Sequence, residues 1–171
     1  MKLFIDEDTG ARLGRALRLV NADVWVVEKN TKITPGTPDA KWIPEVASAN
    51  RIILSRNSQM LEPRYERRLL IDNKAALILL PPHLSSLSLL RLILRKWDWL
   101  VRIWETEPRP FAFRVSVIGN VTREDLEHHK PRRDDLALGP VKPKRARRAR
   151  IRTPPLEFDE HPPRDSKPRD T

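Results

Sequence analysis

Acidic side chains follow the first apolar run of the chain and return at a later point. Asp6, Glu7 and Asp8 come directly after that run, Asp39 follows a polar segment, and Asn57 ends another apolar run. Carboxylates that meet in one place repel one another unless a cation lies among them. Mg²⁺ suits such a place because it prefers oxygen ligands, needs few of them from protein and keeps several waters. One or two such ions activate water and stabilise a phosphodiester during its displacement.

Each of these residues also has an ordinary structural explanation. Acidic residues often follow strands because loops are polar. Asp39 would complement the positive end of a helix dipole, and Asn57 is a common turn residue. Residue type and spacing do not decide between these explanations and a cation site, so the elements that position the side chains matter.

Apolar runs and helical periodicities alternate along the chain. Short strands are predicted at 2–5, 24–27, 51–54 and 75–80, and an alternating edge strand at 111–117. Helices are predicted at 9–21, 37–49, 63–74 and 84–104, the second capped by the Thr37 hydroxyl. This order is typical of an α/β fold with a mostly parallel sheet covered on both faces. Ligands of such sheets gather at the carboxyl ends of the strands, where the acidic residues are expected.

The composition narrows the class of protein. The chain has 171 residues, no cysteine and a net charge of +10. The missing cysteines exclude disulfides and thiolate metal sites and fit a reducing cytoplasm. Strong positive charge favours a polyanionic partner, with nucleic acid as the first candidate. No secretory signal is visible, and the apolar stretch 84–94 is too short for a membrane span.

The C-terminal part differs in composition from the rest. Residues 121–171 contain eight of the chain's 16 prolines and few apolar residues, so we expect a disordered basic tail after a folded domain at 1–120. Residues 142–152 carry seven positive charges and no negative ones. That run would tether a polyanion, keep the tail solvated or contact an acidic partner.

Four segments in this order resemble the PIN-like domains related to VapC-type toxins. They are Leu3-Phe4-Ile5-Asp6-Glu7-Asp8, Thr37-Pro38-Asp39-Ala40-Lys41-Trp42-Ile43-Pro44, Ile52-Ile53-Leu54-Ser55-Arg56-Asn57 and Pro110-Phe111-Ala112-Phe113-Arg114-Val115. The resemblance covers about residues 1–118. It implies a PIN-like three-layer sandwich and a ribonuclease that depends on Mg²⁺ or Mn²⁺.

The resemblance also assigns roles to residues. It implies Asp6 as the leading metal ligand and catalytic residue, Asp39 as the second acid and Asn57 as the third position, with Glu7 and Asp8 as helpers. Relatives usually have aspartate where this chain has Asn57, whose amide brings no charge. Two residues that would compensate are Glu62 and Glu66; the alternative for each is an exposed helical charge.

Several basic residues would bind RNA phosphates, because guanidinium pairs well with phosphate. The candidates are Arg56, Arg64, Arg67 and Arg68, and the alternative for each is a solvated helix face. Trp42 fits the core better than a base-stacking role, and the long helix fits the core or a dimer contact.

Three functions stay open from the sequence. The first is an endoribonuclease, with the toxin of a toxin–antitoxin pair as its more specific form. Its partners would then be RNA, a cognate antitoxin and a second copy of the chain. The second is an RNA- or protein-binding module on the same fold with a weakened metal site. The third is a nucleic-acid tether that works mainly through the tail.

Overall fold

Strands of the N-terminal region form a six-stranded sheet in the order β2-β1-β3-β4-β5-β6. The computed structural model describes residues 1–20, 23–62 and 65–127, which belong to the unit Met1–Leu138. The strands are β1 (Lys2–Ile5), β2 (Asp23–Val26), β3 (Ile52–Ser55), β4 (Ala76–Leu79), β5 (Phe111–Val115) and β6 (Val121–Glu124). All neighbouring pairs are parallel except β5 and β6, which are antiparallel.

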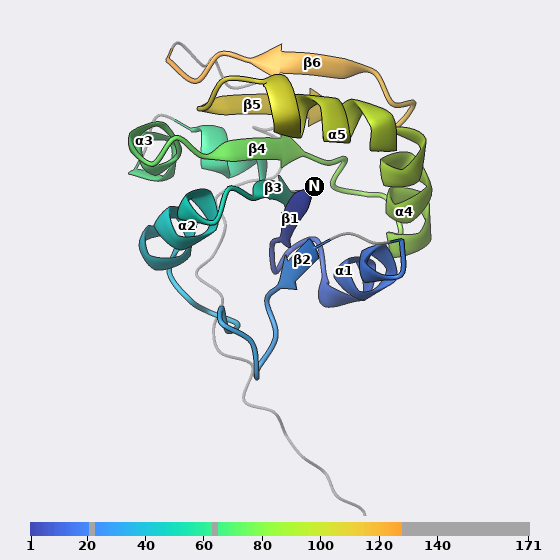
Figure 1. Ribbon diagram of the computed structural model, residues 1–171, viewed down its shortest axis with the longest axis horizontal. Coiled ribbons are helices and arrows are strands. Elements are labelled where there is room, and N and C mark those ends of the chain that lie inside the picture. Colours follow the sequence, from blue (N-terminus) through green and yellow to red (C-terminus); the bar gives the residue numbers. More distant parts are fainter. Residues whose placement is uncertain (21–22, 63–64, 128–171) are drawn as a thin grey trace, which may run out of the picture. The chain divides into compact units, whose positions relative to one another are not determined.

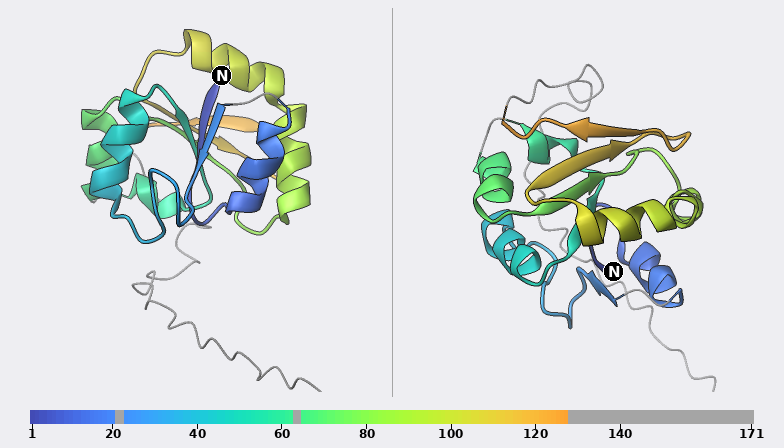
Figure 2. Two further views of the ribbon diagram at one scale, coloured as in Figure 1. Left: turned by 60° about the horizontal axis from the view of Figure 1, so that its bottom comes forward. Right: turned by 45° about the horizontal axis from the view of Figure 1, so that its top comes forward.

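Helices cover both faces of this sheet, as Figures 1 and 2 show. The helices are α1 (Ala11–Arg18), α2 (Asp39–Ser48), α3 (Tyr65–Asp72), α4 (Ser86–Arg95), α5 (Trp97–Thr106) and the short 3₁₀ helix η1 (Ser58–Leu61). One core contains buried residues of α1, α4 and α5, and the other contains those of α2, α3 and η1. The predicted three layers and mostly parallel sheet are therefore confirmed.

Continuous apolar sequence explains the central strands. Every residue of β3 and β4 is buried, as expected where helices cover both faces of a parallel sheet. Trp42 of α2 is also buried, and its ring centroid lies 4.8 Å from that of Phe4 in β1. The prediction that Trp42 belongs to the core is confirmed.

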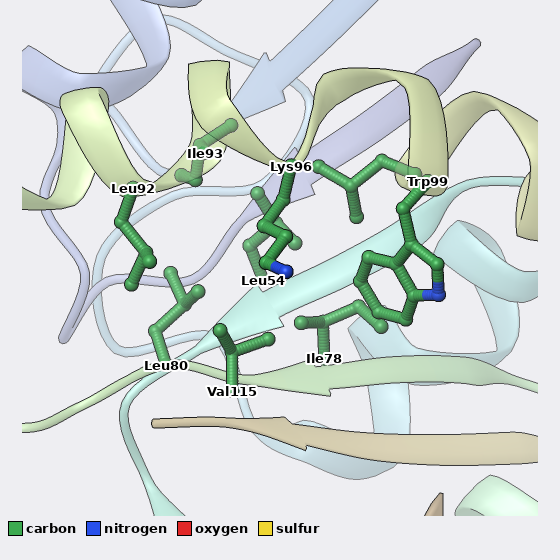
Figure 3. A pocket seen from close by; sticks show the side chains of 9 residues that line it. Leu54, Ile78, Leu80, Leu92, Ile93, Lys96, Trp99 and Val115 are labelled. Carbon is green, nitrogen blue, oxygen red and sulfur yellow. The ribbon is translucent and has the colours of Figure 1, made fainter. Parts of the chain in front are cut away.

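The predicted single helix over 84–104 is wrong, because two helices meet at Lys96. The backbone of Lys96 has φ −101° and ψ 12°, which ends α4 and begins α5. Apolar spacing continues across this break, so the sequence pattern does not reveal it. Near the junction lies an apolar gap of about 10 Å³, which is no larger than one water needs. Figure 3 shows Lys96 among the apolar side chains that line it, so this gap is a packing defect and not a ligand site.

The predicted edge position of β5 is also wrong. β5 lies between β4 and β6, and Arg114 Nε of β5 donates to Glu124 Oε1 of β6 over 2.7 Å. β6 falls within the range 121–171 that the composition assigned to the tail, so the sheet continues beyond the expected boundary at residue 120. The rest of that expected tail, 128–171, lies outside the described residues.

Helix α2 begins one residue later than predicted. Pro38 is its N-cap and provides no side-chain cap, while the Thr37 hydroxyl donates to the Thr34 carbonyl over 2.7 Å. The expected Thr37 cap is therefore wrong. Asp39 keeps its expected place in the first turn, where its charge favours the positive helix end.

Gly14 lets α1 approach the sheet closely. A Cβ atom at this position would lie 2.1 Å from Val26 Cγ1 and 3.2 Å from Ile5 Cγ1. We expect Gly14→Ala to lower the free energy of unfolding by about 1–3 kcal/mol, although alanine favours helices by about 1 kcal/mol. Chemical denaturation of both proteins measures this change. An unchanged or higher midpoint would contradict the close packing.

Candidate functional site

Asp6 lies at the carboxyl end of β1, beside the end of β3. Its backbone N–H donates to the Leu54 carbonyl over 3.1 Å, which extends the parallel pairing of the two strands by one residue. Its own carbonyl accepts the N–H groups of Thr9 and Gly10. Hydrogen bonds from both the N–H and the carbonyl of Asp6 thus fix the position of its backbone, and with it the position of its Cβ atom.

Two donors hold the Asp6 carboxylate. The Ser55 hydroxyl donates to Oδ2 over 2.7 Å, and the Glu7 N–H donates to Oδ1 over 2.6 Å. The same Ser55 hydroxyl accepts the N–H of Asn57 over 3.0 Å. Ser55 is fully buried at the end of β3, so it connects the first acidic position with the third.

The pKa of Asp6 is raised from 3.8 to about 6, and burial is the largest cause. The negative charges of Asp8 and Asp39 contribute to this rise, while the hydrogen bonds from Ser55 and the Glu7 N–H oppose it. Asp8 and Asp39 therefore lie near enough to Asp6 to act on its charge. A half-buried carboxylate among like charges in a loop cluster is typical of a functional site.

Asp39 is positioned by the start of α2 and by an indole. Trp42 Nε1 donates to Asp39 Oδ1 over 2.7 Å from the next turn of the helix. The buried Trp42 ring is itself held against Phe4 of β1. The core packing of one helix turn therefore sets the direction of the second acidic side chain.

Asn57 and Glu7 use their side-chain oxygens in backbone contacts. Asn57 Oδ1 accepts the Gln59 N–H over 3.1 Å and caps η1. Glu7 Oε2 accepts the Gly36 N–H over 3.3 Å. The predicted metal ligand Asn57 thus acts as a helix cap, and Glu7 connects its loop to the segment that precedes α2.

The donors fit a sparsely coordinated cation better than a protein cage. Residues 1–20, 23–62 and 65–127 contain no group of three His, Cys, Asp or Glu side chains that could hold a metal ion. Neither Glu62 nor Glu66 completes such a group. Mg²⁺, however, is often held by one or two carboxylates, with water in its other positions. The like charges acting on Asp6 fit an ion of that kind, with Asp39 as the second carboxylate.

The basic residues predicted to bind RNA have different surroundings. Arg68 Nε donates to both carboxylate oxygens of Asp72 at 3.1 Å, and Arg67 lies half-buried in the same helix. Arg56 donates to backbone carbonyls of other loops. These contacts favour a role for Arg56 within the protein, and its binding of phosphate stays a prediction. Arg64 lies outside the described residues.

Two cations that the sequence reasoning missed lie beside β2. A hollow of about 220 Å³ is lined by residues that include Arg18, Trp25 and Lys32. Lys32 Nζ lies 4.8 Å from the Trp25 ring centroid and also pairs with Glu45. No motif marks these residues, because Arg18 ends α1 and Lys32 follows β2, and only the fold brings both to the same hollow.

The family described as PIN like domain matches residues 1–82. This segment belongs to the PIN-like domain family. The match includes β1, β3 and the start of α2, and therefore Asp6, Asp39 and Asn57. No curated protein and no solved structure matches the chain. The PIN-like fold places its strand ends, with Ser55 and Asp6, at one edge of the sheet. Ser55 was not predicted as a site residue; the register of β1 with β3 is the signal that would have found it.

Within the described residues, no helix of the PIN-like domain is both long enough and apolar enough to cross a membrane.

Proposed function

We propose that the PIN-like domain is an endoribonuclease that depends on Mg²⁺ or Mn²⁺. The observation that carries this proposal is Asp6, a shielded carboxylate at the carboxyl end of β1 whose pKa is raised by burial and by neighbouring acids. Such a group is costly to the fold. A function that needs negative charge at this edge of the sheet explains why a carboxylate lies there.

Asp6 and Asp39 would hold the ion, with Asp8 as a nearby charge. When bound, the ion would activate a water and stabilise the negative charge that develops on the phosphodiester. Ser55 orients the Asp6 carboxylate through its hydroxyl, and Trp42 orients Asp39. These contacts keep two carboxylate side chains in fixed directions before RNA arrives, which lowers the reorganisation that the reaction needs.

Single-stranded RNA is the proposed substrate. The net charge of +10 favours a polyanion. Arg67 and Arg68 remain candidates for phosphate contacts on α3, and the hollow beside β2 adds Arg18 and Lys32. These residues would bind the backbone of RNA regardless of base sequence, because guanidinium and ammonium groups recognise phosphate.

A VapC-type toxin with a cognate antitoxin, acting in the cytoplasm, is the finer form of this proposal. Exposed apolar side chains support a protein partner or a second copy of the chain. They include Leu87 and Leu94 of α4 and Val117 and Ile118 of the turn between β5 and β6. Isolated exposed apolar residues are common, but several near one flank of a domain favour an interface.

The second candidate function is binding of RNA without cleavage. Asn57 favours it, because the position where relatives usually have aspartate provides no charge and its oxygen already caps η1. Binding that depends on salt but not on EDTA, and that survives removal of the Asp6 charge, would favour this function over the nuclease.

We expect the purified full-length chain to cut single-stranded RNA with Mn²⁺ and to lose this activity in EDTA. Asp39→Asn is expected to lower the rate at least about tenfold, because it removes one charge while its amide oxygen still accepts the Trp42 N–H. Gel analysis of a labelled RNA measures cleavage. The exposed Glu105→Gln variant is the matched control and should cut normally. Absence of cleavage with Mn²⁺, both in this chain and after Asn57→Asp, would refute the nuclease proposal.

A further inference from the structure

Arg56 joins three loops at the edge of the sheet where Asp6 lies. Its Nε donates to the Asp8 carbonyl over 2.9 Å, and its Nη2 donates to the same carbonyl. Its Nη1 donates to the carbonyls of Pro82 over 3.1 Å and Leu84 over 3.3 Å. The side chain itself follows β3, so one guanidinium connects the segments after β1, β3 and β4.

These contacts use most of the hydrogen-bonding capacity of the side chain. A guanidinium has about five N–H donors in a rigid planar fork. Four hydrogen bonds to carbonyls leave little for a phosphate, and their directions are fixed by loops that also contact the sheet. The geometry therefore favours a role within the protein over direct contact with RNA.

The Asp8 carbonyl is two residues from Asp6 along the same loop. On either side of Asp8 the loop is held by the Asp6 N–H and by Thr9 Oγ1, which both donate to the Leu54 carbonyl, the hydroxyl over 3.2 Å. β3 therefore holds the acidic loop on both sides of Asp8 through Leu54, and at Asp8 itself through Arg56. Loss of the Arg56 attachment would leave the Asp8 carbonyl without this contact, while the flanking contacts with Leu54 remain.

We propose that Arg56 is a positioning residue for the acidic site: by binding the Asp8 carbonyl it fixes the loop that presents Asp6 and Asp8. This inference rests on the proposed nuclease function. The guanidinium acts through geometry more than through charge. Arg56 is not among the causes of the raised pKa of Asp6. Those causes are burial, the hydrogen bonds from Ser55 and the Glu7 N–H, and the charges of Asp8 and Asp39.

Arg56→Lys tests this role while it keeps the positive charge. Lysine has a single terminal nitrogen and no planar fork, so it cannot bind the Asp8 carbonyl twice and also reach Pro82 and Leu84. We expect kcat for RNA cleavage to fall about tenfold to a hundredfold, since small misplacements of catalytic groups have effects of that size. The KM for RNA and the salt dependence of binding should stay unchanged.

The matched control is Arg109→Lys. Arg109 also donates to backbone carbonyls, those of Arg51 over 3.1 Å and Asn50 over 3.3 Å, but at the amino end of β3. This variant loses a comparable contact away from the acidic loop. We therefore expect kcat to remain near that of the parent chain even if the melting temperature falls.

Amide hydrogen exchange separates this inference from the function on which it rests. The Thr9 and Gly10 N–H groups, which donate to the Asp6 carbonyl, should exchange faster in Arg56→Lys and not in Arg109→Lys. Unchanged exchange would overturn the positioning role whether or not the chain cuts RNA. A higher KM with a weaker salt dependence would also overturn it, because it would make Arg56 a phosphate ligand. If the parent chain cuts no RNA with Mn²⁺, the nuclease proposal fails and the exchange result still decides the role of Arg56.

Discussion

Asn57→Asp is expected to raise RNA cleavage at limiting Mn²⁺ by about tenfold or more. Asn57 has one side-chain oxygen, and it caps η1 by accepting the Gln59 N–H. Aspartate has two oxygens and is an equally good cap, so one would keep this contact and the other would be open to a cation. At about 4 Å and an effective dielectric constant of about 20, a further carboxylate charge attracts a divalent ion by roughly 8 kcal/mol. The desolvation of the two charges offsets much of this attraction.

The measurements are the cleavage rate and the thermal shift as Mn²⁺ is added. Asn57→Ser is the matched control, because serine also caps helices but carries neither charge nor a second oxygen. It should fold and show no gain. If Asn57→Asp and Asn57→Ser behave alike in both measurements, position 57 does not face the ion, and the role implied for it by the family resemblance is wrong.

Runs of apolar residues made the strands of the inner sheet predictable. β3 and β4 are buried throughout and β1 is buried after Lys2, and runs of this length between helical patterns are typical of strands of a covered parallel sheet. β6 has the sequence Val-Thr-Arg-Glu, which carries no apolar pattern. Its place is set by pairing with β5 and by the ion pair of Glu124 with Arg114. A strand stabilised by its partner leaves little signal in its own sequence.

Residue type predicted the acidic edge but not how its members are held. The ends of parallel strands brought Asp6 to the place where ligands gather, and the charge of Asp39 acts on it. The sequence identifies Arg56 only as a cation, whereas its partners are the carbonyls of Asp8, Pro82 and Leu84. Backbone carbonyls are the same at every residue, so no side-chain pattern records them.

Asp6→Asn is expected to abolish cleavage and to stabilise the domain at neutral pH. The pKa of Asp6 is about 6 in the folded domain, against 3.8 ordinarily. Between about pH 4 and pH 6 the folded protein holds a proton that the unfolded chain releases, so folding stability falls as pH rises through this range. A shift of two pKa units corresponds to at most about 3 kcal/mol, and we expect about 1–2 kcal/mol because Asp6 is only half-buried.

Asparagine removes this penalty and retains an oxygen for the Glu7 N–H. Above pH 7, the melting temperature of Asp6→Asn should exceed that of the parent chain by about 3–6 °C. Near pH 4, where Asp6 is protonated, the two melting temperatures should match. Calorimetry across this range measures the difference. Asp98→Asn, at an exposed aspartate in the first turn of α5, is the control and should show no such pH dependence. A constant difference at all pH values would mean that the charge of Asp6 is not its cause.

Divalent cations should remove the difference in melting temperature between Asp6→Asn and the parent chain. Mn²⁺ binds the folded parent chain through the ionised Asp6, so it should raise the melting temperature of that chain and lower the apparent pKa of the carboxylate. Asp6→Asn offers no charge at this position and should respond much less. At saturating Mn²⁺ the stability advantage of the variant is therefore expected to disappear. If both proteins gain equally, the cation binds elsewhere, and the raised pKa of Asp6 reflects burial without a metal function.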